Sequence, residues 1–192
     1  MQKPAGYDEV QVGGDFTPVE LGGHHMVIKA VKEQESKTGK PMIVVAFDFG
    51  KNDKQAKYFS EAFDNDIRPD KKWPANGTSY IMTMDYQDPT KTSRNFKSFI
   101  TSFERSNNVT AIWGDKFCDQ FKNKKIGGVF GIVEEEYNGK VSKRHKLRWF
   151  CDDNKVDSAP IPEEKLLNTS SGATSSEEFM NVPEGSDEEI PF

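Results

Sequence analysis

The apolar positions of this chain recur mostly with the period of two that is typical of β-strands. Five runs are predicted to be β-strands, and they cover residues 25–31, 42–49, 80–86, 126–137 and 141–149. The first two runs flank a polar stretch with Thr38-Gly39 at its turn, and the last two flank Asn138-Gly139, so each pair is predicted to form a hairpin. A short additional strand is predicted over 56–59, and an irregular loop over 64–77, which contains Pro69, Pro74 and Gly77.

One segment between the third and fourth runs has the period of an α-helix. Its apolar residues fall at i, i+3, i+4 and i+7, and they are Phe96, Phe99, Ile100 and Phe103. Thr92 or Ser93 can cap the start of this helix, and Asn107-Asn108 can end it. Trp113, Phe117 and Phe121 follow at four-residue steps and predict a second helical stretch. Both aromatic stripes are interpreted as core.

The order of these elements indicates the fold class. A hairpin, a third strand, one or two helices and a final hairpin match the OB-fold, a five-stranded Greek-key barrel with its helix between strands three and four. Glycines 127, 128 and 131 lie inside the fourth strand, where they permit the bends that a closed barrel needs. We therefore expect a mainly β protein with this barrel. An α+β sandwich with both helices on one face is the alternative topology.

Charge divides the chain into two parts. Residues 1–150 hold 24 Lys and Arg against 20 Asp and Glu, a balance of +4, and residues 151–192 hold 2 against 11, a balance of −9. Together they give the net charge of −5. Regular patterning stops after Asp152, and residues 168–176 are a low-complexity stretch rich in Ser and Thr. The expected domains are a basic folded domain, 1–152, and a flexible, disordered acidic tail, 153–192.

Cations interleaved with aromatic residues in the basic domain suit an unpaired nucleic-acid strand, which presents phosphates and exposed base faces. In the last strand the cations Arg144, Lys146 and Arg148 alternate with His145, Leu147 and Trp149, which predicts a basic face opposite a core face. The candidate DNA-binding cations are Lys37, Lys40, Lys57, Lys71, Lys72, Lys140, Lys143, Arg144, Lys146 and Arg148, and the candidate aromatic residues are Phe47, Phe49, Tyr58, Phe59, Trp73 and Tyr137. For Trp73, stacking on a base and plugging the barrel are both open.

The last six residues combine three acids with a short apolar end: Asp187, Glu188, Glu189, Ile190, Pro191 and Phe192. Burying the Phe192 ring in a partner's pocket is worth roughly 1.5–3 kcal/mol, and Pro191 limits the freedom lost on docking. This end resembles the C-terminal tip of the bacterial and phage single-stranded DNA-binding proteins. In that family the tip recruits DNA-processing enzymes, so the resemblance implies replication or recombination proteins as partners of this tip.

These observations predict a non-enzymatic protein that coats single-stranded DNA without strong sequence preference and recruits replication, recombination or repair enzymes through its tip. A recombination mediator or strand-annealing protein is the alternative binding function. A metal-dependent nuclease that uses Asp64, Asp66 and Asp70 is the enzymatic alternative, although Arg68 lies among these acids and the glycine of a calcium loop is missing. The sequence leaves open whether the chain forms a homo-oligomer and whether it prefers DNA over RNA.

Several other classes lack support in the sequence. Cys118 and Cys151 are isolated, so neither a zinc site nor a disulfide framework is expected, and no cofactor is implied. His24-His25 lacks the spacing and glutamate of a zinc protease. No apolar run reaches the roughly 18 residues that cross a bilayer, and no secretory signal is recognised, so no membrane contact and a cytoplasmic location in a bacterial host cell, possibly phage-encoded, are expected.

Overall fold

A computed structural model describes residues 2–3 and 17–167 of the protein. The predictions for the low-complexity stretch and for the tip Asp187–Phe192 concern residues outside this part. The described elements are β1 (Gly22–Glu35), β2 (Pro41–Phe49), α1 (Tyr58–Asp64), η1 (Ala75–Gly77), β3 (Thr78–Met82), α2 (Arg94–Asn107), η2 (Asp119–Phe121), β4 (Lys125–Tyr137), β5 (Lys140–Cys151) and η3 (Asp153–Ser158).

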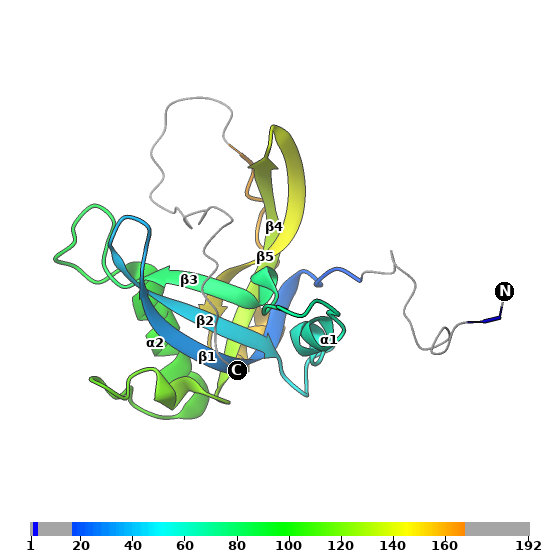
Figure 1. Ribbon diagram of the computed structural model, residues 1–192. Helices are drawn as coiled ribbons and strands as arrows, with labels where there is room; N and C mark the ends of the chain where they lie inside the picture. Colours follow the sequence, from blue (N-terminus) through cyan, green and yellow to red (C-terminus); the bar gives the residue numbers. More distant parts are fainter. Residues whose placement is uncertain (1, 4–16, 168–192) are drawn as a thin grey trace.

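The five strands form one antiparallel sheet in the order β3-β2-β1-β4-β5 (Figure 1). The long strand β1 pairs with β2 along one edge and with β4 along the other edge over residues 22–27. Strands β3 and β5 are the edges, and within the described residues no hydrogen-bonded pairing joins them. Helix α2 contacts both edge strands and β4. The predicted mainly β architecture with five strands is confirmed, and the sheet is not closed by pairing.

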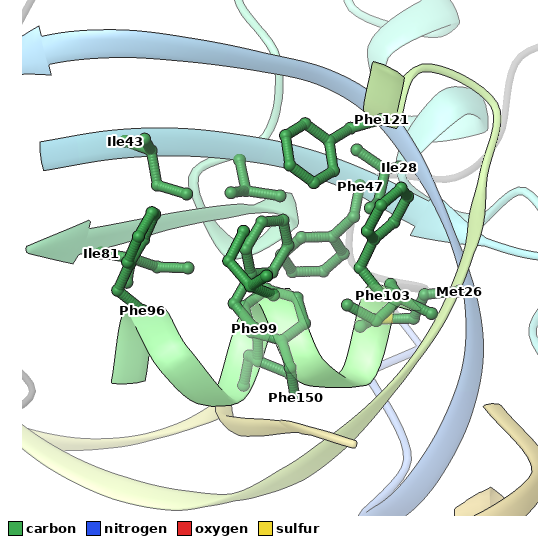
Figure 2. Close-up of a cluster of buried hydrophobic side chains, with 14 of the residues drawn as sticks. Met26, Ile28, Ile43, Phe47, Ile81, Phe96, Phe99, Phe103, Phe121 and Phe150 are labelled. Atoms are coloured by element: carbon green, nitrogen blue, oxygen red, sulfur yellow. The ribbon is translucent and has the colours of Figure 1, made fainter. Parts of the chain in front are cut away.

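Helix α2 packs its apolar stripe on the concave side of the sheet. Phe96, Phe99 and Phe103 point from this helix toward Ile43 and Phe47 of β2 and their neighbours (Figure 2). The Ser93 hydroxyl accepts the hydrogen bond of the Phe96 backbone N–H at 3.1 Å, and Asn108 ends the helix with a left-handed backbone. The predicted helix and both of its predicted ends are therefore confirmed.

Two local predictions are wrong. Residues 58–64 form helix α1 where a strand was predicted over 56–59. The carboxylate of Asp48, on β2, accepts hydrogen bonds from the backbone N–H groups of Phe59 and Ser60, so a distant residue caps this helix. The stretch after α2 contains only the 3₁₀ turn η2 in place of a second helix. In that stretch Phe117 and Phe121 are buried as expected, but Trp113 is 64% exposed.

A bulge in β5 changes which residues face the core. Val129 of β4 pairs with Trp149, and its neighbour Phe130 pairs with Leu147, so Arg148 is the extra residue. Beyond the bulge the alternation is shifted by one position. As a result Phe150 is buried in place of Trp149, which had been assigned to the core.

Residues 153–167, which belong to the predicted tail, pack on the body. Val156 of η3 is buried, and a Cβ atom on Gly127 of β4 would lie 2.7 Å from its side chain. Glycine at position 127 therefore allows η3 to approach the strand. Farther along, Lys165 pairs with Val133 of β4 in a parallel bridge, with hydrogen bonds of 2.9 and 3.0 Å to Glu134 and Ile132. This short strap, residues 163–167, lines the free edge of β4.

Candidate nucleic-acid interface

Strand β2 is buried on both sides, and its two faces have different roles. Ile43, Val45, Phe47 and Phe49 belong to the hydrophobic core. Phe47 is fully buried and Phe49 is 2% exposed, so neither ring can stack on a base. Their assignment as DNA-binding residues is corrected for this reason. The side chains that alternate with them, Met42, Val44 and Ala46, lie on the opposite side of the sheet.

This opposite side of β1, β2 and β3 is called the outer face here. The pairing register places Val44 between Lys32 of β1 and Tyr80 of β3, and Met42 between Gln34 and Met82. The flanking side chains on β1 and β3 are partly exposed, while Val44 beneath them is 3% exposed. The face therefore has an apolar floor with an aromatic ring along one side and a lysine along the other.

An aromatic residue with a lysine beside it lies at each end of the outer face. At one end the ammonium of Lys29, the residue at the bulge in β1, lies 6.0 Å from the ring centre of Trp73 and 3.8 Å from the Asp48 carboxylate. Trp73 packs partly on the core and donates its indole N–H to the carbonyl of Gly77 at 3.1 Å. At the other end the ammonium of Lys40 lies 3.9 Å from the ring centre of Tyr86, which is 66% exposed.

The predicted residues around α1 divide between core and surface. Phe59 is 1% exposed, so its assignment as a base-stacking residue is also corrected. Tyr58 is half-buried, its hydroxyl donates to the carbonyl of Thr17 at 2.7 Å, and burial raises the pKa of its phenol. Lys57, which directly precedes α1, is exposed and has a left-handed backbone conformation. The ammonium of Lys71 lies 4.8 Å from the ring centre of Phe63.

The cations of the last strand lie on a projecting arm, defined as residues 131–146 of β4 and β5, beyond the part of β4 that pairs with β1 (Figure 1). Here the predicted basic face is largely neutralised. Glu135 of β4 forms ion pairs with Lys146 and, at 3.9 Å, with Arg144. Of the three cations predicted on this strand face, Arg144 and Lys146 are therefore paired with an acid.

The strap holds two more of the predicted cations. Lys143 forms an ion pair of 2.5 Å with Glu164, and its hydrogen bond to this carboxylate raises the pKa of the ammonium. Arg148 donates to the backbone carbonyl of Glu163 at 2.8 Å. At the tip of the arm, Tyr137 is 59% exposed and pairs with the exposed Lys140. Lys37 and Lys72 are exposed in the β1–β2 turn and in the loop before η1.

The structure therefore brings together a set of residues that only partly overlaps the predicted set. The outer face contains Lys40 and Trp73 from the prediction, together with Lys29, Lys32, Tyr80, Met82 and Tyr86, which were not selected. A signal for Tyr80 and Met82 was present in the alternation of residues 80–86. No comparable signal existed in β2, because positions 42–47 are apolar without interruption.

One of the three acids considered for a nuclease, Asp66, forms a surface ion pair with Arg68. Both carboxylate oxygens of Asp66 accept hydrogen bonds from the guanidinium of Arg68, which lowers the pKa of Asp66 to about 2. Among residues 2–3 and 17–167, no group of three or more His, Cys, Asp or Glu residues is arranged to hold a metal ion. Within the same residues, no helix has the length and apolar character needed to cross a bilayer.

Comparison of the chain with protein-family models and with curated proteins gave no match.

Proposed function

We propose that the protein is a non-catalytic single-stranded DNA-binding protein of the OB-fold class, and that the outer face of β1, β2 and β3 is its principal DNA-binding surface. Single-stranded DNA would bind with little sequence preference, because every base has a face that can stack on a ring and every nucleotide has a phosphate. The single observation that carries this proposal is the outer face itself. It combines Tyr80 and Trp73 with Lys29, Lys32 and Lys40 over an apolar floor.

The order of the elements supports the OB-fold assignment. Strands β1 to β3 form a meander, α2 follows β3, and β4 returns to the free edge of β1 before β5, as in the five-stranded Greek-key barrel. OB-folds are partly open barrels, and helix α2 lies against both edge strands. The open edge between β3 and β5 is therefore compatible with this fold.

The dimensions of the outer face suit several nucleotides. From Met42 to Asp48 the strand β2 rises about 20 Å, at about 3.3 Å per residue. A single DNA strand that lies along this face meets Lys40 near one end, where a phosphate can be neutralised, and its bases can contact the rings of the face. Lys29, near the other end, already pairs with Asp48 at 3.8 Å and offers less charge.

A salt titration tests this function. The full-length protein is mixed with a labelled oligo-dT at several salt concentrations, with a duplex of equal length as the control. For a single strand, log K falls with log salt at a slope of about −0.7 per neutralised phosphate, so four contacts give about −2.8. A slope near zero, or equal binding of the duplex, would contradict the proposal. Adding magnesium to the same mixture distinguishes protection of the strand from cleavage, and a complementary oligonucleotide reveals annealing.

The proposed recruitment role rests on the sequence of the tip. Phe192 supplies the apolar group and Asp187, Glu188 and Glu189 supply charge for a basic pocket rim. Phe192→Ala is expected to abolish capture of DNA-processing enzymes from a bacterial extract and to leave oligo-dT affinity unchanged. Equal capture by both proteins would exclude the tip as the recruiting element.

A further inference from the structure

Trp113, in the loop between α2 and β4, is a large aromatic side chain that the core does not accommodate. It is 64% exposed, although its neighbour Phe117 is 5% exposed. The two rings are nearly parallel, with an interplanar angle of 15° and centroids 5.2 Å apart. Phe96 of α2 supports the indole from another side, with ring centroids 6.2 Å apart. The indole is therefore an exposed plate that rests on two core phenylalanines.

Hydrogen bonds hold the loop that carries this plate. The Gln120 side chain accepts from the Ile112 backbone N–H at 2.7 Å and donates to the carbonyls of Ile112 and Phe117, each at 2.8 Å. The carboxylate of Glu104, on α2, accepts from the Ala111 N–H at 2.9 Å. These bonds fix the loop on both sides of Trp113, so little conformational freedom remains to be lost when a ligand stacks on the ring.

The loop adjoins the free edge of β1, and Trp113 lies on the side of the sheet that carries α2. Beyond its pairing with β4, β1 bonds to this loop: the Ile28 N–H donates to the Lys124 carbonyl at 2.9 Å, and the Asn123 N–H donates to the Ile28 carbonyl at 2.8 Å. A DNA strand that leaves the outer face over the edge of β1 therefore reaches the loop next. In Figure 1 this loop projects at the same end of the sheet as the β1–β2 turn and the loop between β3 and α2.

The same loop carries three exposed lysines. Lys116, Lys122 and Lys124 are exposed, and no ion pair within residues 2–3 and 17–167 involves any of them. Two exposed acids, Asp115 and Asp119, also lie on the loop, so its net charge is +1. An exposed aromatic plate on a loop with lysines that form no ion pair with a described residue is a combination that suits single-stranded nucleic acid.

We infer that the α2–β4 loop is a second base-stacking subsite, in which Trp113 stacks on one base of the bound strand and Lys116, Lys122 and Lys124 hold the adjoining phosphates. This inference rests on the proposed function and extends it, because it places the strand's exit over the edge of β1. The ligand is single-stranded DNA long enough to run beyond the outer face.

Two oligo-dT lengths test the inference. A strand of about four nucleotides covers the outer face alone, and one of about sixteen also reaches the loop. In the full-length chain, Trp113→Ala is expected to weaken binding of the long strand about fivefold or more and to leave the short strand unaffected. Trp113→Phe, which keeps a ring, is expected to restore most of the affinity.

Ile112→Ala is the matched control, because Ile112 is 61% exposed on the same loop and has no ring. It is expected to leave both affinities unchanged, and a loss equal to that of Trp113→Ala would overturn the stacking role. Unchanged binding of the long strand by Trp113→Ala would also overturn the inference, while the proposed function would stand. A change in oligomeric state with unchanged DNA affinity would identify a protein contact and overturn it as well. If the wild-type protein bound neither strand, the proposed function itself would fail.

Discussion

The arm and the α2–β4 loop are both rich in cations, but their cations differ in what surrounds them. On the arm, Glu135 forms ion pairs with Lys146 and Arg144, and Glu164 forms an ion pair with Lys143. On the loop, which also carries the exposed acids Asp115 and Asp119, Lys116, Lys122 and Lys124 have no ion pair with a described residue, and the exposed Trp113 lies on the same loop. A count of cations along the sequence favours the arm, whereas the surroundings of each cation favour the loop. The charge available to DNA depends on the second of these.

The largest effect on binding is expected from removing the loop cations. The triple variant Lys116→Gln, Lys122→Gln and Lys124→Gln should reduce the salt slope by about 2.1, at about 0.7 per phosphate. At about 0.1 M salt this corresponds to roughly 100-fold weaker binding of a long oligo-dT. The measurement is a salt titration of fluorescence anisotropy.

The matched control removes the same charge from the arm: Lys143→Gln, Arg144→Gln and Lys146→Gln. Because acids already compensate these cations, the slope should change by much less. Equal losses for the two triple variants would remove the distinction between the regions.

In the interior, as on the arm, a carboxylate pairs with a basic side chain: buried Asp53 contacts the ring of buried His24. Asp53 accepts hydrogen bonds from the ring of His24 and from the backbone N–H of His25 and Gln55. Burial alone would raise the pKa of Asp53, but these hydrogen bonds outweigh it and lower the pKa below 3.8. Asp53→Asn brings an amide against these donors and is expected to cost about 2 kcal/mol of the free energy of unfolding at pH 7.

The pH dependence has a definite sign. A carboxyl whose pKa is lower in the folded state than in the unfolded state stabilises the protein fully at a pH above its unfolded-state pKa, ordinarily 3.8. This stabilisation is lost as the pH falls through the lower pKa of the folded state. The difference between the wild type and Asp53→Asn should therefore narrow as the pH falls from about 5, as urea denaturation at each pH would show. Asp64→Asn is the control, because this carboxylate is exposed and no ion pair among the described residues involves it. A constant difference between pH 7 and pH 3 would show that Asp53 has no such role.

A smaller effect is expected from a single ring on the outer face. Tyr80→Ala should weaken oligo-dT binding about tenfold, within the range that removal of one stacked base costs. Tyr137→Ala, on the arm, serves as the comparison and should have less effect. Equilibrium titration at one salt concentration measures both. A greater loss from Tyr137→Ala would move the binding surface to the arm.

The smallest effect is expected from a variant that tests whether ion pairing limits the binding of DNA by the arm cations. Glu135→Gln removes the acid that contacts Lys146 and Arg144, so these cations become available to phosphates. Because surface ion pairs are worth less than about 1 kcal/mol, affinity should rise no more than about fivefold at low salt. Glu136→Gln, a neighbour with an exposed side chain, controls for the change in net charge. If both variants raise affinity equally, pairing has no role.

The sequence predicted five strands and helix α2 from their apolar runs and periods, although β3 ends at Met82 and not at residue 86. It predicted the turn at Asn138-Gly139, where φ is positive, 50° and 75°. It missed α1, whose start is capped by Asp48 from another element. It also misassigned Trp149, because the bulge at Arg148 reverses the alternation. Such long-range and bulge effects leave no local period in the sequence.

The sequence predicted which types of residue form the candidate site, but not which face of the sheet carries them. Aromatic residues and lysines together indicated a single strand, but the phase of β2 could not be read through its unbroken apolar run, and this put Phe47 and Phe49 on the wrong face. The partners of the arm cations lie across the hairpin and in the strap, as with Glu164 and Lys143, and sequence proximity does not reveal them.

Titration of the ¹⁵N-labelled full-length protein with an oligo-dT of about sixteen nucleotides tests the central claim most directly. Amide signals of Lys32, Tyr80 and Trp113 should shift at low salt, together with those of their neighbours, while signals of Arg144 and Lys146 on the arm should change little. Shifts confined to the arm, or no shifts at low salt, would contradict the account.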